Sequence, residues 1–260
     1  MGGVIYIGDQ AVGKTTLALE LMKPGQGLVT ATPFTVNYTT LKDLLLDSQG
    51  RVKPTGEILA SKKAIVDDYS FEVDMTINNV PCSYTCQWLD TPGEIWQQSW
   101  QSYNHSEWQN VLNTFKSVDG ILLILAPYRE IISFTPPNDD PSNYLTRQQW
   151  IKRFDRWVHF FNHQCPKIRH LIICLHKVDL VCSAQDLSVE IQKLSYNPND
   201  PNWQWKNTHI KQRYFSVIRE QLQQLDQGMS GRSVRCFISS TQYRDLLELP
   251  WIYLGSYLAT

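Results

Sequence analysis

Two glycines, a lysine and a threonine near the N-terminus form a pattern that can hold a phosphate group. Gly8, Gly13, Lys14 and Thr15 have the spacing G-x-x-x-x-G-K-T, between the apolar run VIYI and the helix-forming run TTLALELMK. Glycines let the backbone approach an anion closely, and the N–H groups of a helix N-terminus point at it. We predict that Lys14 contacts the β and γ phosphates of a nucleotide and that the Thr15 hydroxyl ligates Mg²⁺. The predicted loop also contains Asp9, Gln10, Ala11, Val12 and Thr16.

A second acidic element follows 76 positions after Lys14, where an apolar run ends in WLDTPGE. Asp90 would lie at the carboxyl end of its strand, which is where open parallel sheets place their ligands. Its carboxylate can hold the Mg²⁺ shell, and Gly93 can offer a backbone N–H to a γ phosphate without obstruction by a side chain.

A third element, His176-Lys177-Val178-Asp179, ends the apolar run HLIICL. The two carboxylate oxygens of Asp179 can accept hydrogen bonds from N1–H and the 2-amino group of guanine. Adenine has an acceptor at N1 and no 2-amino group, so it would leave the carboxylate unpaired, at a cost of several kcal/mol. The aliphatic stem of Lys177 would lie along the base or the ribose. The segment therefore predicts selection of guanine.

GDQAVGKT, DTPG and HKVD, in this order, resemble the motifs of the Ras-like and translation-factor P-loop GTPases. The resemblance implies a protein that binds GTP and GDP with Mg²⁺, hydrolyses GTP to GDP and phosphate, and acts as a molecular switch for a protein partner. His176 replaces the usual asparagine, as it also does in Rag GTPases. By the same resemblance FISST matches the S-A-K loop, with Ser239, Ser240 and Thr241 at its three positions and the Ser240 N–H facing guanine O6.

In that class a switch threonine that binds Mg²⁺ lies between the phosphate loop and the second strand. Thr55, within RVKPTGE, is the best candidate, and Thr32, Thr35 and Thr39 compete with it. The tract resembles a segment of the G-protein alpha subunits in which an arginine stabilises transition-state charge, so Arg51 is a candidate arginine finger. A solvated surface arginine is the alternative.

After DTPG, Ras-like enzymes carry a glutamine that orients the attacking water, whereas this chain has Glu94. A carboxylate beside the γ phosphate predicts slow intrinsic hydrolysis. Alternatively, Glu94 points outward and caps the following helix. Two rival functions stay open: an ATP-dependent P-loop NTPase or kinase, and a nucleotide-binding scaffold with little hydrolysis.

Short apolar runs alternate with helical patterns, which predicts an α/β fold of the Ras-like P-loop NTPase type. We expect a six-stranded, mostly parallel sheet with one antiparallel edge strand and helices on both faces. A hairpin around Asn78 and Asn79 supplies the antiparallel pairing. The strands are predicted at 3–7, 69–77, 84–89, 120–126, 170–175 and 233–238.

Four helices are predicted from periodicity and from capping residues. Trp150, Phe154, Trp157 and Phe161 form one buried aromatic stripe. Another helix begins with Ser106 and Gln109 as a capping box and buries Trp108, Val111, Leu112 and Phe115. A third runs from about Asn207 to Leu225. A short C-terminal helix has Pro250 in its first turn and packs on the body, with a docking segment for a partner as the alternative.

Composition limits the remaining possibilities. The 260 residues carry 24 Lys and Arg against 25 Asp and Glu, so we expect no nucleic-acid partner, and no apolar run is long enough to span a membrane. The six cysteines contain no C-x-x-C pair and are interpreted as reduced thiols of a cytoplasmic protein, with a zinc site at Cys82 and Cys86 as the alternative.

We predict one domain, 1–260, with insertions near 24–64, 127–145 and 195–206. Trp96, Trp100, Tyr103 and Trp108 form either a surface for a protein partner or part of the core.

Overall fold

A computed structural model of the protein describes residues 3–9, 11–25, 27–53, 67–90, 96, 98–134, 140–165, 168–228 and 233–258. For residues 67, 68, 90 and 98–100 it describes the backbone alone. Its described strands form a seven-stranded sheet in the order β2-β3-β4-β1-β5-β6-β7. The strands are β1 (Val4–Gly8), β2 (Val29–Pro33), β3 (Asp67–Ile77), β4 (Val80–Asp90), β5 (Gly120–Leu125), β6 (His170–Leu175) and β7 (Ser233–Ile238).

The centre of the sheet is parallel and covered on both faces. β1 pairs in parallel with β4 and β5, and β6 pairs in parallel with β5 and β7. Every residue of β1 and β5 is buried, as expected for strands whose sequences are apolar at consecutive positions. Because these strands run in one direction, their carboxyl ends lie along one edge of the sheet.

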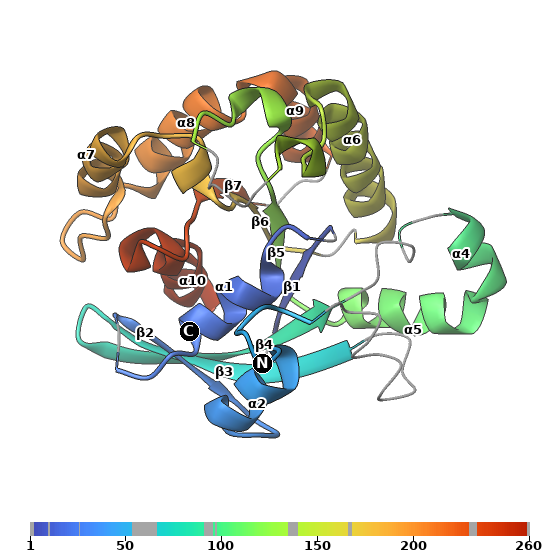
Figure 1. Ribbon diagram of the computed structural model, residues 1–260, viewed down its shortest axis with the longest axis horizontal. Coiled ribbons are helices and arrows are strands. Elements are labelled where there is room, and N and C mark those ends of the chain that lie inside the picture. The colour runs from blue at the N-terminus through green and yellow to red at the C-terminus, as the bar shows by residue number, and fades with distance from the viewer. Residues whose placement is uncertain are drawn as a thin grey trace.

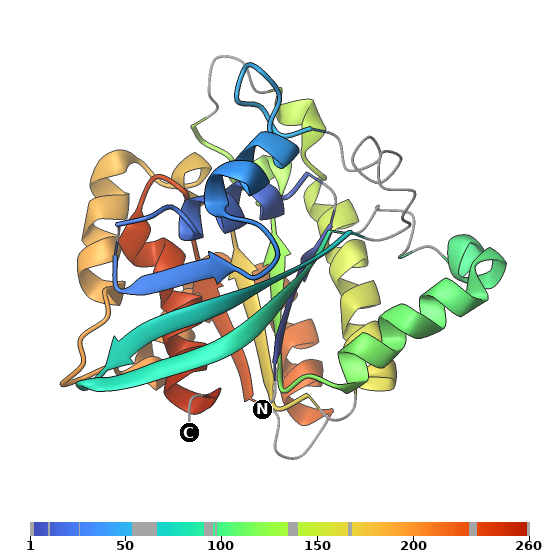
Figure 2. The ribbon, with the colours of Figure 1, turned by 90° about the horizontal axis from the view of Figure 1, so that it is seen from below.

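Helices cover both faces of the sheet. α1 (Lys14–Leu21) and α10 (Arg244–Leu258) pack together on one face, and α10 contacts β2, β3, β4, β6 and β7. α5 (His105–Lys116), α6 (Arg147–Gln164) and α9 (Arg219–Gln227) lie on the other face (Figures 1 and 2). The other described α-helices are α2 (Tyr38–Leu45), α4 (Gln98–Tyr103), α7 (Ala184–Leu194) and α8 (Trp203–Tyr214).

The predicted α/β class, the mostly parallel sheet and the helices on both faces are confirmed, but two details of the sheet are wrong. The described part of the chain forms seven strands instead of six, because β2 lies inside the predicted insertion 24–64, where α2 also forms. The antiparallel strand is β3, which pairs antiparallel with both β2 and β4, so it is not the edge strand. The run VTATP has a weak strand pattern, because only Val29 and Ala31 are buried and Pro33 ends the run.

The aromatic stripe of α6 is confirmed: Trp150, Phe154, Trp157 and Phe161 are all buried. The buried face predicted for α5 is likewise confirmed. The predicted capping box of α5 is wrong. Asn104 is the N-cap, and the hydroxyl of Ser106 donates a hydrogen bond to the carboxylate of Glu107 instead.

The helix predicted over 207–225 is two helices, α8 and α9, joined by a 3₁₀ turn at Ser216–Ile218. The break lets Phe215 and Ile218 both reach the core, where neither is exposed to solvent. The C-terminal helix is longer than predicted and contains Pro250 in its interior. Burial of the whole stretch from Leu246 to Gly255 outweighs the cost of a proline inside a helix, about 3 kcal/mol.

All six cysteines are free thiols. Cys86, Cys174 and Cys236 are buried in β4, β6 and β7. Burial raises the pKa of the Cys86 thiol well above its usual range, which disfavours the thiolate that zinc would need. Within the described residues no helix has both the length and the apolar composition needed to cross a membrane.

Candidate nucleotide-binding site

The loop between β1 and α1 has the backbone geometry of an anion cradle. Gly13 has φ 97° and Ala11 has φ 60°, so the chain turns through the left-handed region before α1 begins at Lys14. A Cβ atom at Gly8 would lie 2.5 Å from the carbonyl oxygen of Ile124. A Cβ atom at Gly13 would lie 2.8 Å from Cδ2 of His176. Both glycines are therefore required by close neighbours and not by the turn alone.

Lys14 lies inside this loop and is 5% exposed. Its Nζ donates hydrogen bonds to the carbonyl oxygens of Gly8, at 3.1 Å, and Asp9, at 2.9 Å. The hydroxyl of Tyr6 donates to the Lys14 carbonyl oxygen at 2.9 Å and ties the helix start to β1. A buried ammonium group thus lies at the N-terminus of a helix, and both features favour a bound anion. Thr15, the next helical residue, is also buried.

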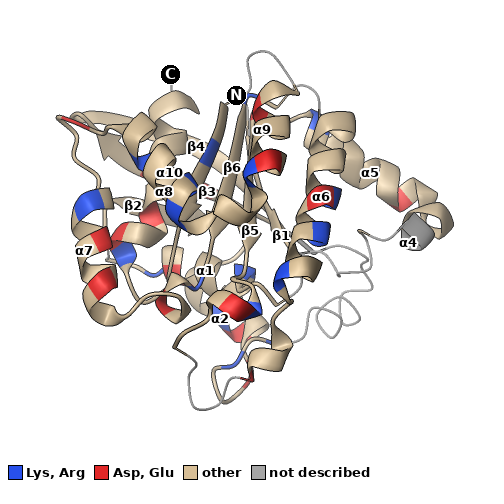
Figure 3. Ribbon diagram, turned by 90° about the horizontal axis from the view of Figure 1, so that it is seen from above, with Lys and Arg blue, Asp and Glu red and all other residues tan. Residues whose placement is uncertain are grey.

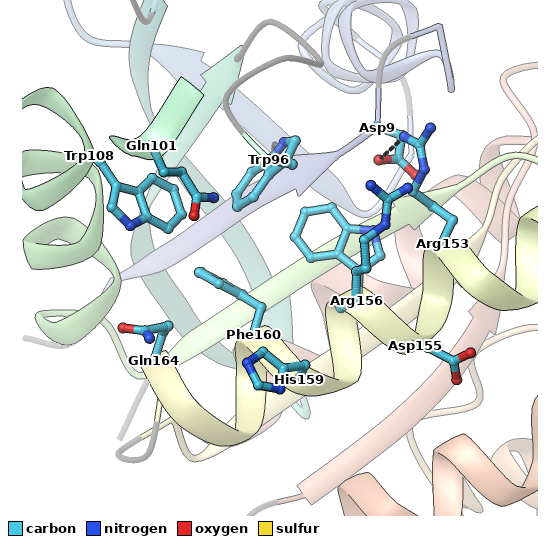
Figure 4. A pocket seen from close by; sticks show the side chains of 11 residues that line it. Asp9, Trp96, Gln101, Trp108, Arg153, Asp155, Arg156, His159, Phe160 and Gln164 are labelled. Carbon is cyan, nitrogen blue, oxygen red and sulfur yellow. Dashed lines mark hydrogen bonds and ion pairs between the residues drawn. The ribbon is translucent and has the colours of Figure 1, made fainter. Parts of the chain in front are cut away.

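Asp9, the second residue of the loop, forms an ion pair that no sequence pattern predicts. Its Oδ1 accepts a hydrogen bond from Nη1 of Arg153 at 2.9 Å (Figure 4). Arg153 belongs to α6, 144 positions later in the chain. The sequence signal for α6 was its aromatic stripe, and nothing distinguished Arg153 from other helical arginines.

Asp90 is the last residue of β4. The parallel pairing of β1 with β4 runs as far as Tyr6 and Trp88, two residues before Gly8 and Asp90 end their strands. Asp90 and Gly8 therefore end neighbouring strands at the same edge of the sheet, while the Asp90 side chain is outside the described residues. Gln10, Thr55, Gly93 and Glu94 also lie outside the described residues, so their predicted roles stay predictions.

Arg51 lies in an exposed turn, where its Nε contacts the Asp47 carboxylate at 2.9 Å. Its side chain is 70% exposed. The competing switch threonines also have exposed positions: Thr32 in β2, Thr35 after it and Thr39 in α2. Neither the finger role nor the switch ligand is tested by these positions.

His176 follows β6 and is 2% exposed. Its Nδ1 lies 3.0 Å from Oγ of Ser239, and its ring lies against Gly13 of the phosphate loop. Burial, with the nearby Lys177 charge, lowers the pKa of His176 to about 3, so its ring is neutral at physiological pH. His176 thus joins the loops that follow β1, β6 and β7.

Lys177 and Asp179 lie beside this junction. Lys177 has φ 60°, and its Nζ lies 3.5 Å from the hydroxyl of Tyr144 and 5.3 Å from the centre of that ring. Asp179 is half-buried, and its Oδ2 accepts a hydrogen bond of 3.3 Å from the Gln242 side chain. A carboxylate held by one long bond to an exposed amide keeps most of its acceptor capacity for a ligand.

Ser239, Ser240 and Thr241 follow β7 at the same edge. The Ser239 carbonyl accepts a hydrogen bond from the N–H of Val178, which attaches this loop to the one that follows β6. Ser240 is fully buried, and its hydroxyl accepts a hydrogen bond from the N–H of Gln242, whereas Thr241 is half-buried.

A cavity of about 670 Å³ opens next to Asp9, between α5 and α6. Its walls include Trp96, Trp108, Trp157 and Phe160 (Figure 4). Trp96 packs against Trp157 at a ring distance of 4.5 Å and edge-on against Trp108 at 5.9 Å. Trp108 is therefore part of the core, whereas Tyr103 of α4 is 90% exposed. Of Trp100 only the backbone is described.

Comparison with known proteins gives little beyond these observations. No protein-family model matches the sequence, and no curated protein matches it. Among solved structures, an Era variant of Aquifex aeolicus bound to GDP·AlF₄⁻ aligns with all of this chain, at 14% identity and a TM-score of 0.38. Era in complex with MgGDPNP and a segment of 16S ribosomal RNA aligns with 98% of this chain, at 14% identity and a TM-score of 0.37. This chain spans 57% and 56% of the length of those two chains.

Proposed function

We propose that this protein binds GTP and GDP with Mg²⁺ and hydrolyses GTP to GDP and phosphate. The observation that carries the proposal is the contact between Gly13 of the phosphate loop and His176 of the HKVD segment. This contact joins an anion cradle to a loop that holds a carboxylate, Asp179, with free acceptor capacity. A guanine nucleotide has the two chemical groups, phosphates and a purine with adjacent N–H donors, that such a pair of loops would bind.

Mg²⁺ fits the residues at the phosphate loop. This ion keeps several waters and takes most other ligands from nucleotide phosphates, so one or two protein oxygens are enough. The Thr15 hydroxyl at the start of α1 and the carboxylate of Asp90, the last residue of β4, are the proposed ligands, with Thr55 as the proposed third. When bound, Mg²⁺ would neutralise charge on the phosphates, and Lys14 would hold the β and γ phosphates in place.

Hydrolysis is proposed to be slow in the isolated protein. Glu94 occupies the position at which related sequences carry a water-orienting glutamine, and a carboxylate there adds negative charge beside the γ phosphate. Arg51 would supply positive charge only after leaving Asp47. A nucleotide-binding scaffold with little turnover is the second candidate, which single-turnover hydrolysis distinguishes from the first.

We further propose that the nucleotide controls binding of a protein partner, as in a molecular switch. The cavity between α5 and α6 lies beside Asp9 of the phosphate loop and has aromatic walls, which suits a partner's apolar side chain. Figure 3 shows both basic and acidic residues on α6, α7 and α9, and the chain has a net charge of −1. These features support a protein partner over a nucleic acid. The absence of a nucleic-acid partner stays a prediction, as does a cytoplasmic location.

The test is to measure the affinity of the purified protein for GTP, GDP and ATP, with and without Mg²⁺. We expect tight, Mg²⁺-dependent binding of both guanine nucleotides and at least tenfold weaker binding of ATP. Lys14→Ala should lower the affinity for every nucleotide, since it removes a phosphate contact and not a base contact. Equal affinity for ATP and GTP would instead favour a general P-loop NTPase or a kinase.

A further inference from the structure

The phosphate loop carries its own negative charge. The Asp9 side chain is 10% exposed and comes directly after Gly8, within the stretch whose carbonyl oxygens hold the Lys14 ammonium. A carboxylate in this position repels the phosphates of a bound nucleotide. The repulsion is strong where water is largely excluded, since like charges there are poorly screened.

Arg153 is placed to offset that charge. Its guanidinium donates to Oδ1 of Asp9 at 2.9 Å, and its side chain is 31% exposed. The 18-residue helix that carries it begins with a full capping box at Thr146 and buries Trp150, Phe154 and Trp157 on either side of Arg153 along the chain. The arginine is therefore presented by a rigid element that is packed in the core, so its position does not depend on the loop itself.

We propose that Arg153 is a positioning residue for the phosphate site. It neutralises Asp9 and fastens the loop to α6, so that nucleotide affinity depends on a residue that contacts no nucleotide. This inference rests on the proposed function and adds to it a determinant outside the sequence motifs. Removing the guanidinium leaves the Asp9 charge uncompensated, whereas removing both charges leaves the loop neutral.

The experiment is a titration of the full-length protein with GDP in the presence of Mg²⁺. We expect Arg153→Ala to weaken binding about 10- to 100-fold, because the partly screened Asp9 charge is then left beside the phosphates. Asp9→Asn should bind at least as tightly as the wild type. The double variant Asp9→Asn/Arg153→Ala should return to within about threefold of Asp9→Asn alone. Arg153→Lys, which keeps the charge, should lose less than Arg153→Ala.

Lys152→Ala is the matched control, because Lys152 is an exposed cation on the same helix. If Arg153→Ala does not fold, Arg153→Gln, which keeps much of the side chain without its charge, replaces it in the comparison. Unchanged affinity after loss of the guanidinium would overturn the inference, and so would a double variant as weak as the single one, since that result indicates damage to α6. A wild-type protein that binds no nucleotide would overturn the proposed function as well.

Discussion

Replacing Asp179 by alanine separates recognition of the base from binding of the phosphates. In the protein without nucleotide, the carboxylate is half-buried and accepts one long hydrogen bond, 3.3 Å, from Gln242. Little stability is lost with a bond of that length to an exposed amide, so we expect the free energy of unfolding to change by less than about 1 kcal/mol. With guanine bound, two hydrogen bonds to a charged acceptor are lost, each contributing about 1.5 to 3 kcal/mol. The affinity for GDP should then fall by about 10²- to 10⁴-fold.

The assay is equilibrium titration with GDP and ADP, which avoids hydrolysis during the measurement. ADP affinity should be unchanged or slightly higher, because adenine offers Asp179 no matching donors. Asp186→Ala is the control, because Asp186 is an exposed carboxylate at the start of α7 that is paired with Ser183. Equal losses for GDP and ADP would show general damage to the site. An unchanged GDP affinity would refute the assignment of Asp179 as the guanine-selecting residue.

Three other predictions concern the junction of the loops and its support. Gly13→Ala should lower GDP affinity at least tenfold and the free energy of unfolding by about 1–3 kcal/mol, measured by titration and chemical denaturation, because φ is 97° and the new Cβ would meet His176. The pKa of His176 is lowered to about 3, against about 6.5 in the unfolded chain. The contribution of its neutral ring to the free energy of unfolding is therefore constant above pH 6.5 and is lost as the pH falls below that value. Between pH 7 and pH 5, the free energy of unfolding measured with urea should decrease by about 2 kcal/mol more in the wild type than in His176→Gln. Identical decreases in the two proteins would contradict this. Glu248→Ala should lower the free energy of unfolding by about 3–5 kcal/mol, because it removes a buried carboxylate and leaves the half-buried Arg244 guanidinium without it. Glu20→Ala, at an exposed pair, should lower it by less than about 1 kcal/mol in the same denaturation experiment.

The central strands could be predicted from the sequence because parallel strands covered on both faces must be apolar at consecutive positions. The runs predicted at 170–175 and 233–238 are β6 and β7, residue for residue, and that at 120–126 differs from β5 by one residue. The edge of the sheet could not be predicted in the same way. β2 buries only two side chains, so its pattern is too short to separate a strand from a loop, and α2 depends on an Asn37 cap within the same region.

The same contrast applies to the candidate site. The phosphate loop is one contiguous segment, and its glycines, lysine and helix start can be recognised together. The ion pair of Asp9 with Arg153, by contrast, joins residues 144 positions apart. The Glu248 carboxylate accepts hydrogen bonds from the backbone N–H groups of Leu28 and Val29, which are about 220 positions earlier in the chain. Each of these contacts joins single polar residues, whereas the helices that carry Arg153 and Glu248 are predicted from their apolar and capping residues. The contacts therefore become visible only in the folded structure.

His176 shows how a departure from a motif can be compatible with the proposed function. Its imidazole is buried and neutral, bonds to Ser239 and packs against Gly13, so it faces protein on both sides. In this position the side chain holds three loops together and offers no atom to a base. In the proposed function guanine is selected by Asp179, which lies beside the junction with its acceptor capacity largely unused. A residue at the first position of the segment therefore needs the right size and a hydrogen-bonding atom toward Ser239, and a histidine meets both requirements.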